Sequence, residues 1–129
     1  MSKAAHTTRE TGQQAEDSAI TWLERQGLVL LQRNFRTPGR GGGEIDLIMR
    51  SADGTLVFVE VRHRANAVHG GAAASITHGK RRRIILAARH YLMQLRREPV
   101  CRFDAMVCDG PLPEQGGQWQ WLQAAFDAS

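Results

Sequence analysis

Two apolar segments separated by a short turn restrict the fold of this chain more than any other feature. Residues 43–48 and 58–62 are rich in Ile, Leu, Val and Phe, and Ala52, Asp53 and Gly54 stand in the turn between them. This pattern predicts a β-hairpin with a three-residue loop, in which the glycine adopts the left-handed conformation. We therefore expect an antiparallel pair of strands in this part of the chain.

The length of the loop determines which residues of the hairpin face each other. A three-residue loop places Asp46 opposite Glu60, and Glu44 opposite Arg62. Because side chains alternate along a strand, all four project from one face. The other face is wholly apolar and consists of Ile45, Leu47, Met49, Val57, Val59 and Val61. A two-residue loop would shift the register by one residue and place Asp46 and Glu60 on opposite faces.

Composition predicts a soluble globular protein that is basic overall. The chain has 129 residues, of which 42% are hydrophobic and 23% charged, with a net charge of +4. We expect a flexible N-terminus over residues 1–10 and a single domain over residues 11–129. The polar N-terminus and the lack of a long apolar run predict a cytoplasmic protein without a membrane partner. The positive charge suits nucleic acid as a partner.

Hydrophobic periodicity and turn residues divide the chain into a mixed sheet flanked by helices. In chain order, we expect a helix over residues 11–26, a strand over 28–35, a glycine-rich loop over 37–43, the hairpin, a loop over 64–74, a helix over 77–97, a strand over 100–108 and a short strand over 118–122. The order of elements is therefore αβββαβ, with one further strand. Asp104 is expected to have a structural role, through Arg102 or a backbone amide.

The acidic face of the hairpin is the strongest candidate for a site of chemistry. Paired carboxylates are oxygen ligands for Mg²⁺ or Mn²⁺, which assist phosphodiester cleavage. Asp46 and Glu60 would meet this need, and Lys80 would enter from the first turn of the second helix. Glu16 lies beside the buried stripe of the first helix, so it either approaches the site or points to water from an edge position. The alternative for the whole face is a solvated polar stripe.

Basic residues surround this candidate site in the sequence. Arg81, Arg82 and Arg83 occupy the first turn of the second helix, where positive charge opposes the helix dipole. This arrangement suggests an anionic partner, although a solvated run of charge is the simpler alternative. Arg36 and Arg40 flank the glycine-rich loop, which is either an arm over a phosphate backbone or a plain connection.

Residues 43–48 and 57–62, together with Lys80 and residues 102–104, resemble the YraN family of uncharacterised bacterial proteins. That family is similar in turn to the restriction-endonuclease-like superfamily, which is named for its Pro-Asp…(Asp/Glu)-X-Lys motif and includes archaeal Holliday-junction resolvases. The resemblance implies an αβββαβ core and metal-dependent phosphodiesterase chemistry. It assigns Asp46 to the Asp of the motif, Glu60 to its Asp/Glu, and Glu16 to the helix Glu of resolvase-like members.

The chain departs from the motif at two positions. Arg62 stands where the motif has Lys, and Ile45 stands where it has Pro. A guanidinium retains the positive charge and can clamp a phosphate, but it cannot lose a proton to act as a base. If the motif's lysine must act as a base, then either this protein is catalytically impaired or Lys80 has taken over the role.

We therefore expect a metal-dependent nuclease acting on DNA, including branched or irregular DNA. Asp46 and Glu60 would hold Mg²⁺ or Mn²⁺ with help from Glu16 and Glu44, and Arg62 and Lys80 would contact the scissile phosphate. The residues expected to follow the DNA backbone are Arg36, Arg40, Arg64, Arg81, Arg82 and Arg83. A homodimer would suit cleavage of two strands. The alternative is a catalytically inactive module that binds nucleic acid or a protein partner.

Overall fold

A five-stranded mixed sheet forms the centre of the protein in the computed structural model, which describes residues 8–39, 41–65 and 71–128. The strand order follows the sequence, and only the pairing of β3 with β4 is parallel. The strands are β1 (Val29–Arg36), β2 (Glu44–Arg50), β3 (Leu56–Arg64), β4 (Cys101–Asp109) and β5 (Gln120–Phe126). The pairing of β3 with β4 is parallel because the chain between these strands forms a helical crossover, which returns it to the same end of the sheet.

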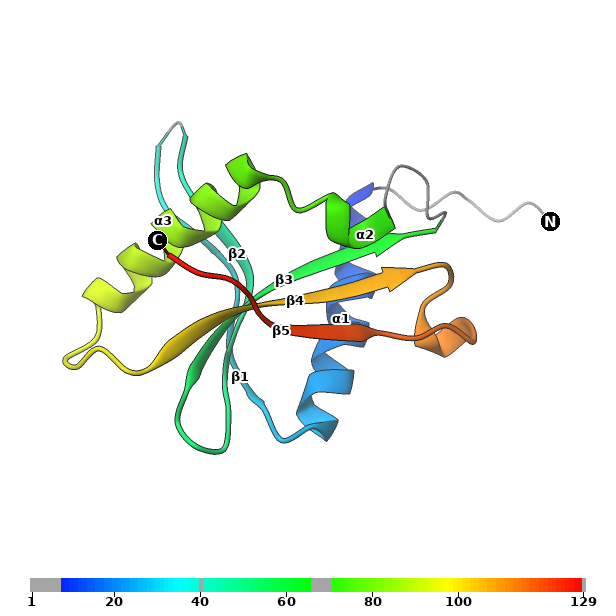
Figure 1. Ribbon diagram of the computed structural model, residues 1–129, viewed down its shortest axis with the longest axis horizontal. Helices are drawn as coiled ribbons and strands as arrows, with labels where there is room; N and C mark the ends of the chain where they lie inside the picture. Colours follow the sequence, from blue (N-terminus) through cyan, green and yellow to red (C-terminus); the bar gives the residue numbers. More distant parts are fainter. Residues whose placement is uncertain (1–7, 40, 66–70, 129) are drawn as a thin grey trace.

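Helices cover both faces of this sheet (Figure 1). Helix α1 (Thr8–Arg25) packs its apolar side, including Ala19 and Leu23, on the face formed by Leu47, Val57 and Val59. Helices α2 (Gly71–Ala74) and α3 (His78–Met93) lie on the opposite face. The architecture confirms the predicted α/β class and is consistent with a restriction-endonuclease-like αβββαβ core. None of the described helices has the length and apolar character needed to cross a membrane.

The predicted hairpin register is confirmed. Leu47 pairs with Val59, and Arg50 pairs with Leu56. The loop is closed by the N–H of Ser51, which donates to the carbonyl of Thr55 at 2.9 Å, and Gly54 has a φ of +89°. The three-residue loop therefore sets the register that places Asp46 and Glu60 on one face.

Several element boundaries differ from the predictions. Helix α1 begins at Thr8, before the predicted start, while residues 1–7 of the predicted flexible N-terminus lie outside the described part of the chain. Residues 71–74 form a short helix within a predicted loop, because the Asp109 carboxylate accepts the N–H of Ala72 at 2.7 Å. Helix α3 ends at Met93 instead of residue 97, since Met93 is 79% exposed and gains no packing from a further turn.

A buried carboxylate on β4 organises the last strand. Asp104 is fully buried and accepts hydrogen bonds from Arg102 Nε, Trp121 Nε1 and the N–H of Ala124. Ala124 has a positive φ of 51°, at the point where the pairing of β4 with β5 is irregular. The structural role expected for Asp104 is therefore confirmed, and the residue shapes the end of β5.

Candidate active site

Strands β2 and β3 separate at the end of the hairpin away from its loop. Their last regular pair is Leu47 with Val59. One residue beyond it, the side chain of Asp46 accepts the backbone N–H of Val61 at its Oδ2 atom, at 2.9 Å. A carboxylate thus satisfies a donor that would otherwise pair across the ladder, and space for a pocket opens between the strands.

This acidic pocket has a volume of about 140 Å³ and is lined by Glu44, Asp46, Glu60, Arg62, Lys80 and Arg83. The first four are the residues that the hairpin register placed on one face, and Lys80 enters from the first turn of α3 as predicted. Thr77 caps this turn, because its hydroxyl accepts the N–H of Lys80 at 3.3 Å. The pocket therefore brings three carboxylates and three cations together from β2, β3 and α3.

A glycine allows β2 to approach α3 closely enough to form the pocket. A Cβ atom on Gly43 would lie 2.1 Å from the carbonyl oxygen of Arg83 and 2.7 Å from the nitrogen of Ala87. The same contact places the start of β2 beside α3. Ile45 therefore packs in the cluster with Ile84, and not with the other members of the apolar hairpin face on which it was predicted to lie. The glycine-rich loop before β2 is also held to α3, since Arg83 Nε donates to the carbonyl of Gly42.

Glu60 has the most strongly perturbed ionisation in the pocket. Its side chain is 8% exposed. Burial, followed by the hydrogen bond to Asp46 and the negative charge of that residue, raises the pKa of Glu60 to about 9. Arg62 and Lys80 act in the opposite direction, and Arg62 Nη2 lies 3.3 Å from Glu60 Oε2. The two cations do not cancel the rise in the pKa of Glu60 that burial and the second carboxylate cause. The pocket therefore favours a bound proton or another bound cation.

The ion pairs differ from those implied by the hairpin register. Glu44 was predicted to face Arg62 but pairs with Arg36 of β1 at 3.4 Å, while Arg62 pairs with Glu60. The physical reason is that β2 has neighbours on both sides, and Arg36 is directly opposite Glu44 in the β1–β2 register. The splaying of β2 from β3 removes the competing contact. Arg36 is therefore engaged in an ion pair and less available to a ligand than we expected.

Two side chains of the pocket have nitrogen atoms that could act on a substrate. Arg62 can bind an anion, and Lys80 can exchange a proton. The Nε atom of Arg62 is buried and has no hydrogen-bond partner among the described residues. A buried donor without an acceptor is costly, and a bound phosphate oxygen would satisfy it. Burial and the nearby charge of Arg62 lower the pKa of Lys80. Lys80 thus gives up a proton more readily than an exposed lysine does.

Glu16 lies at the edge of this site. It is 14% exposed and pairs with Arg33 of β1 at 3.2 Å. Burial and then the charge of Asp46 raise the pKa of Glu16, in spite of Arg33. The effect of the Asp46 charge on this pKa places Glu16 near the site, which is the first of the two alternatives that the sequence left open for this residue. Glu16 does not line the acidic pocket itself.

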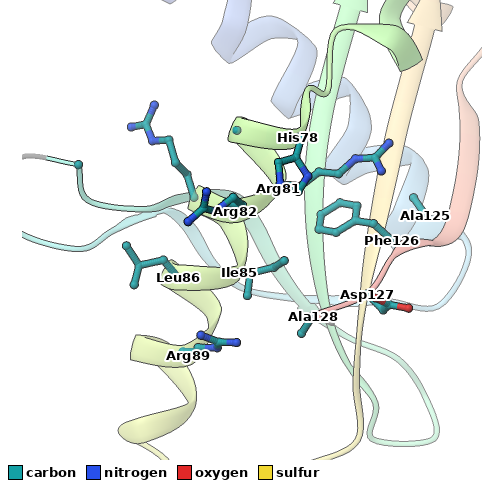
Figure 2. Close-up of a pocket in the computed structure, with 13 residues that line it drawn as sticks. His78, Arg81, Arg82, Ile85, Leu86, Arg89, Ala125, Phe126, Asp127 and Ala128 are labelled. Carbon is teal, nitrogen blue, oxygen red and sulfur yellow. The ribbon is translucent and has the colours of Figure 1, made fainter.

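A larger groove lies beside the acidic pocket, between α3 and the end of β5 (Figure 2). This α3–β5 groove has a volume of about 800 Å³, and its lining includes Arg81, Arg82, Arg83, Arg89, Leu86 and Phe126. Arg83 lines both the groove and the acidic pocket. Three of the arginines predicted to follow a DNA backbone therefore share one surface.

The other predicted backbone contacts are more scattered. Arg64 is exposed at the end of β3, close enough to Lys80 for its charge to lower the pKa of that lysine. Arg36 is paired with Glu44, and Arg40 lies outside the described residues. The α3–β5 groove is therefore the best-defined basic surface.

Sequence reasoning missed four residues of these sites. Arg89 is seven residues after Arg82, a helical spacing that could have shown that both lie on one side of α3. Phe126 was beyond the predicted end of the last strand. Arg33 and Asn34, which both hydrogen-bond to Glu16, gave no signal, because only the packing of α1 on the sheet brings them to that carboxylate.

The donors of the acidic pocket are suited to a hard divalent cation that retains several waters. Asp46 and Glu60 supply oxygen ligands, as Mg²⁺ and Mn²⁺ prefer, and both line the same pocket. No group of three or more His, Cys, Asp or Glu side chains within residues 8–39, 41–65 and 71–128 forms a complete metal cage. The pocket therefore fits a cation held by two carboxylates, with water or substrate oxygens completing its shell.

Fold and site together define a class of protein: an α/β protein with a pocket of carboxylates and cations at the open end of a β-hairpin, next to a basic groove. The chain belongs to the uncharacterised protein family UPF0102, whose family model matches residues 15–108. This result confirms the resemblance to the YraN family.

Similar relatives share almost the whole chain. A UPF0102 protein of Albidiferax ferrireducens is 64% identical over 122 residues, which cover 95% of this chain and 91% of the relative. A UPF0102 protein of Polaromonas sp. is 57% identical over 126 residues, covering 95% and 85%. A UPF0102 protein of Paracidovorax citrulli is 61% identical over 122 residues, covering 95% and 86%. Their names state a family and no activity.

Proposed function

We propose that this protein is a divalent-metal-dependent nuclease that hydrolyses phosphodiester bonds in DNA, including branched or irregular DNA. The observation that carries the proposal is the pair of carboxylates Asp46 and Glu60, which line one pocket together with Arg62 and Lys80. A buried carboxyl group with a strongly raised pKa, such as that of Glu60, in a cleft with a second carboxylate and cations is typical of catalytic sites.

Each residue of the pocket has a defined role in this proposal. Asp46 and Glu60 would hold Mg²⁺ or Mn²⁺, whose chemistry when bound would be to lower the pKa of a water and stabilise charge on the phosphate. Arg62 donates its free Nε–H to a phosphate oxygen. Lys80, with its lowered pKa, orients the attacking water or accepts its proton. Glu44 and Glu16 assist from the edge of the site.

The basic groove supports nucleic acid as the substrate. Arg81 and Arg82 line the groove, and Arg83 connects it to the acidic pocket. A phosphate backbone lying along α3 would therefore bring one phosphate next to Asp46 and Glu60, while its neighbours contact guanidinium groups. This arrangement also balances the dipole cost of placing three arginines in a first helical turn.

A cleavage assay tests the proposal. The wild-type protein is incubated with branched, flapped, single-stranded and duplex DNA in the presence of Mn²⁺ or Mg²⁺, beside Glu60→Ala. Glu24→Ala is the matched control, because Glu24 is an exposed glutamate on α1 outside both pockets. We expect cleavage by the wild type and the control, and its loss in Glu60→Ala. Equal cleavage by Glu60→Ala would overturn the assignment of the site.

A second candidate function is a catalytically inactive module that binds nucleic acid. Two observations favour it: Arg62 replaces the lysine of the motif, and Arg33 holds Glu16 in an ion pair. The two functions differ in metal binding. Titration of Mn²⁺ into the wild type and Asp46→Ala should show binding that Asp46→Ala loses if the protein is a nuclease. DNA binding without any metal binding would favour the inactive module.

A further inference from the structure

The α3–β5 groove is lined by both positively charged and apolar side chains. Arg82 and Arg89 approach it from α3, and Phe126 approaches it from the end of β5, with the apolar side chains of Ile85 and Leu86 nearby (Figure 2). Among the described residues, neither Arg82 nor Arg89 has a carboxylate partner within ion-pair distance. Asp127 is the one acidic side chain among the described residues that line the groove. The groove is thus suited to a ligand that carries negative charge and also has a flat apolar part.

Aromatic rings lead from the core of the sheet into this groove. Phe58 stacks on Phe103 with a centroid distance of 5.4 Å, and Phe103 stacks on Phe126 with a centroid distance of 5.0 Å. Arg81 lies at the outer end of this row, with its Cζ atom 5.5 Å from the centre of the Phe126 ring. Phe126 is half-buried and Arg81 is exposed, so the last members of the row border the groove. Flat guanidinium and aromatic groups in this arrangement form a stacking platform.

We propose that the α3–β5 groove binds an unpaired nucleotide of the DNA strand. Its base stacks on the outer face of the Arg81 guanidinium, which the Phe126 ring supports from the other side, and its flanking phosphates bind Arg82 and Arg89. The volume of about 800 Å³ is within the range of small-molecule sites, so a nucleotide fits. Arg83 then continues the path of the backbone into the acidic pocket. This inference rests on the proposed function, for which it names the substrate class: DNA with a single-stranded portion next to the scissile bond.

A regular duplex does not satisfy the same groove. The bases of a duplex are stacked and paired inside the helix, so only its phosphates could reach the arginines, and the platform would remain unused. Contacts to phosphates alone would give binding that depends on salt but not on Phe126. The role of Phe126 therefore separates the two modes of binding.

Fluorescence anisotropy in the presence of EDTA tests this inference without cleavage. The probes are a labelled oligothymidylate of about 20 nucleotides and a duplex of the same length. We expect the single strand to bind at least about tenfold more tightly than the duplex. Phe126→Leu should weaken binding of the single strand by about tenfold, whereas Phe126→Trp, which retains a stacking surface, should bind like the wild type.

Charge variants provide a second, independent measurement on exposed residues. Arg82→Gln and Arg89→Gln should each reduce the slope of log affinity against log salt by about one, because each removes one phosphate contact. Arg50→Gln is the matched control, since Arg50 is exposed on β2 beside the hairpin loop and lines neither pocket. We expect its slope to equal that of the wild type.

The outcomes distinguish this inference from the nuclease proposal. Equal affinity for single strand and duplex, or equal affinity of Phe126→Leu and the wild type for the single strand, would overturn the inference even if the protein cleaves DNA. Single-strand binding that depends on Phe126 in a protein without any metal-dependent cleavage would support the groove assignment and refute the nuclease.

Discussion

Asp46 Oδ2 accepts the backbone N–H of Val61 at 2.9 Å, so an acidic side chain occupies the place of a bond across the hairpin. The contact ends the regular pairing of β2 with β3 and turns the end of a hairpin into a pocket. It also holds the carboxylate of Asp46 beside Glu60. One residue thus shapes the site and supplies one of its two candidate metal ligands.

This double role predicts how variants of Asp46 behave. Asp46→Asn retains an oxygen acceptor for the N–H of Val61 but loses the negative charge. We expect it to fold with a melting temperature close to that of the wild type and to lose metal-dependent cleavage by on the order of 100-fold or more. Asp46→Ala, which also leaves the N–H of Val61 without its partner, should lose stability by about 1–3 kcal/mol. Cleavage by Asp46→Asn at the wild-type rate would contradict the proposed site.

The raised pKa of Glu60 predicts that the stability of the protein decreases as the pH rises. The pKa of Glu60 is raised to about 9, from 4.5 for an unperturbed glutamate. The carboxyl is protonated in both the folded and the unfolded chain at low pH. As the pH rises between these two values, the unfolded chain releases the proton and the folded protein keeps it, so stability is lost.

Glu60→Gln removes this effect, because an amide can donate to Asp46 without ionising. Without metal, the free energy of unfolding of Glu60→Gln relative to the wild type should increase from pH 5 to pH 8 by at least about 1 kcal/mol. Urea unfolding in EDTA at the two pH values measures this difference. A constant difference would show that Glu60 ionises normally in the folded protein.

Variants of Arg62 test whether the site needs a positive charge or a base at the position of the motif's lysine. The free Nε–H of Arg62 indicates an electrostatic role toward phosphate. We therefore expect Arg62→Lys to cleave within about tenfold of the wild-type rate, and Arg62→Ala to lose on the order of 100-fold or more. The measurement is the single-turnover cleavage rate with Mn²⁺. A gain of more than about 100-fold in Arg62→Lys would instead show that a base is required here and that Lys80 does not supply it.

Gly43 is predicted to be essential for folding. A Cβ atom at this position would lie 2.1 Å from a backbone oxygen of α3, and backbone cannot move aside as a flexible side chain can. Gly43→Ala should therefore lose more than about 2 kcal/mol of stability. Gly12→Ala is the control, because Gly12 lies in α1 with nothing within 4 Å of the added Cβ, and it should gain about 0.5–1 kcal/mol. Equal melting temperatures for the two variants would contradict the close approach of β2 to α3.

The local sequence pattern was sufficient to predict the hairpin and the residues that its polar face brings together. The alternation of apolar residues and the turn at residues 52–54 predicted the register of β2 and β3, and with it the shared face of Asp46 and Glu60. Helical spacing predicted that Lys80 points inward from α3. These features depend on neighbours a few residues apart or on one short loop, so the sequence alone contains the information that specifies them.

Only the tertiary structure decided the electrostatics and the surroundings of the site. Arg36 pairs with Glu44, and Arg33 with Glu16, because β1 pairs with β2 on one side and contacts α1. The raised pKa of Glu60 depends on its burial beside Asp46, and the α3–β5 groove requires helix α3 and the end of β5 to lie side by side. Desolvation and long-range contacts of this kind have no local signature. They depend on how the helices pack on the sheet, and only the folded chain sets that packing.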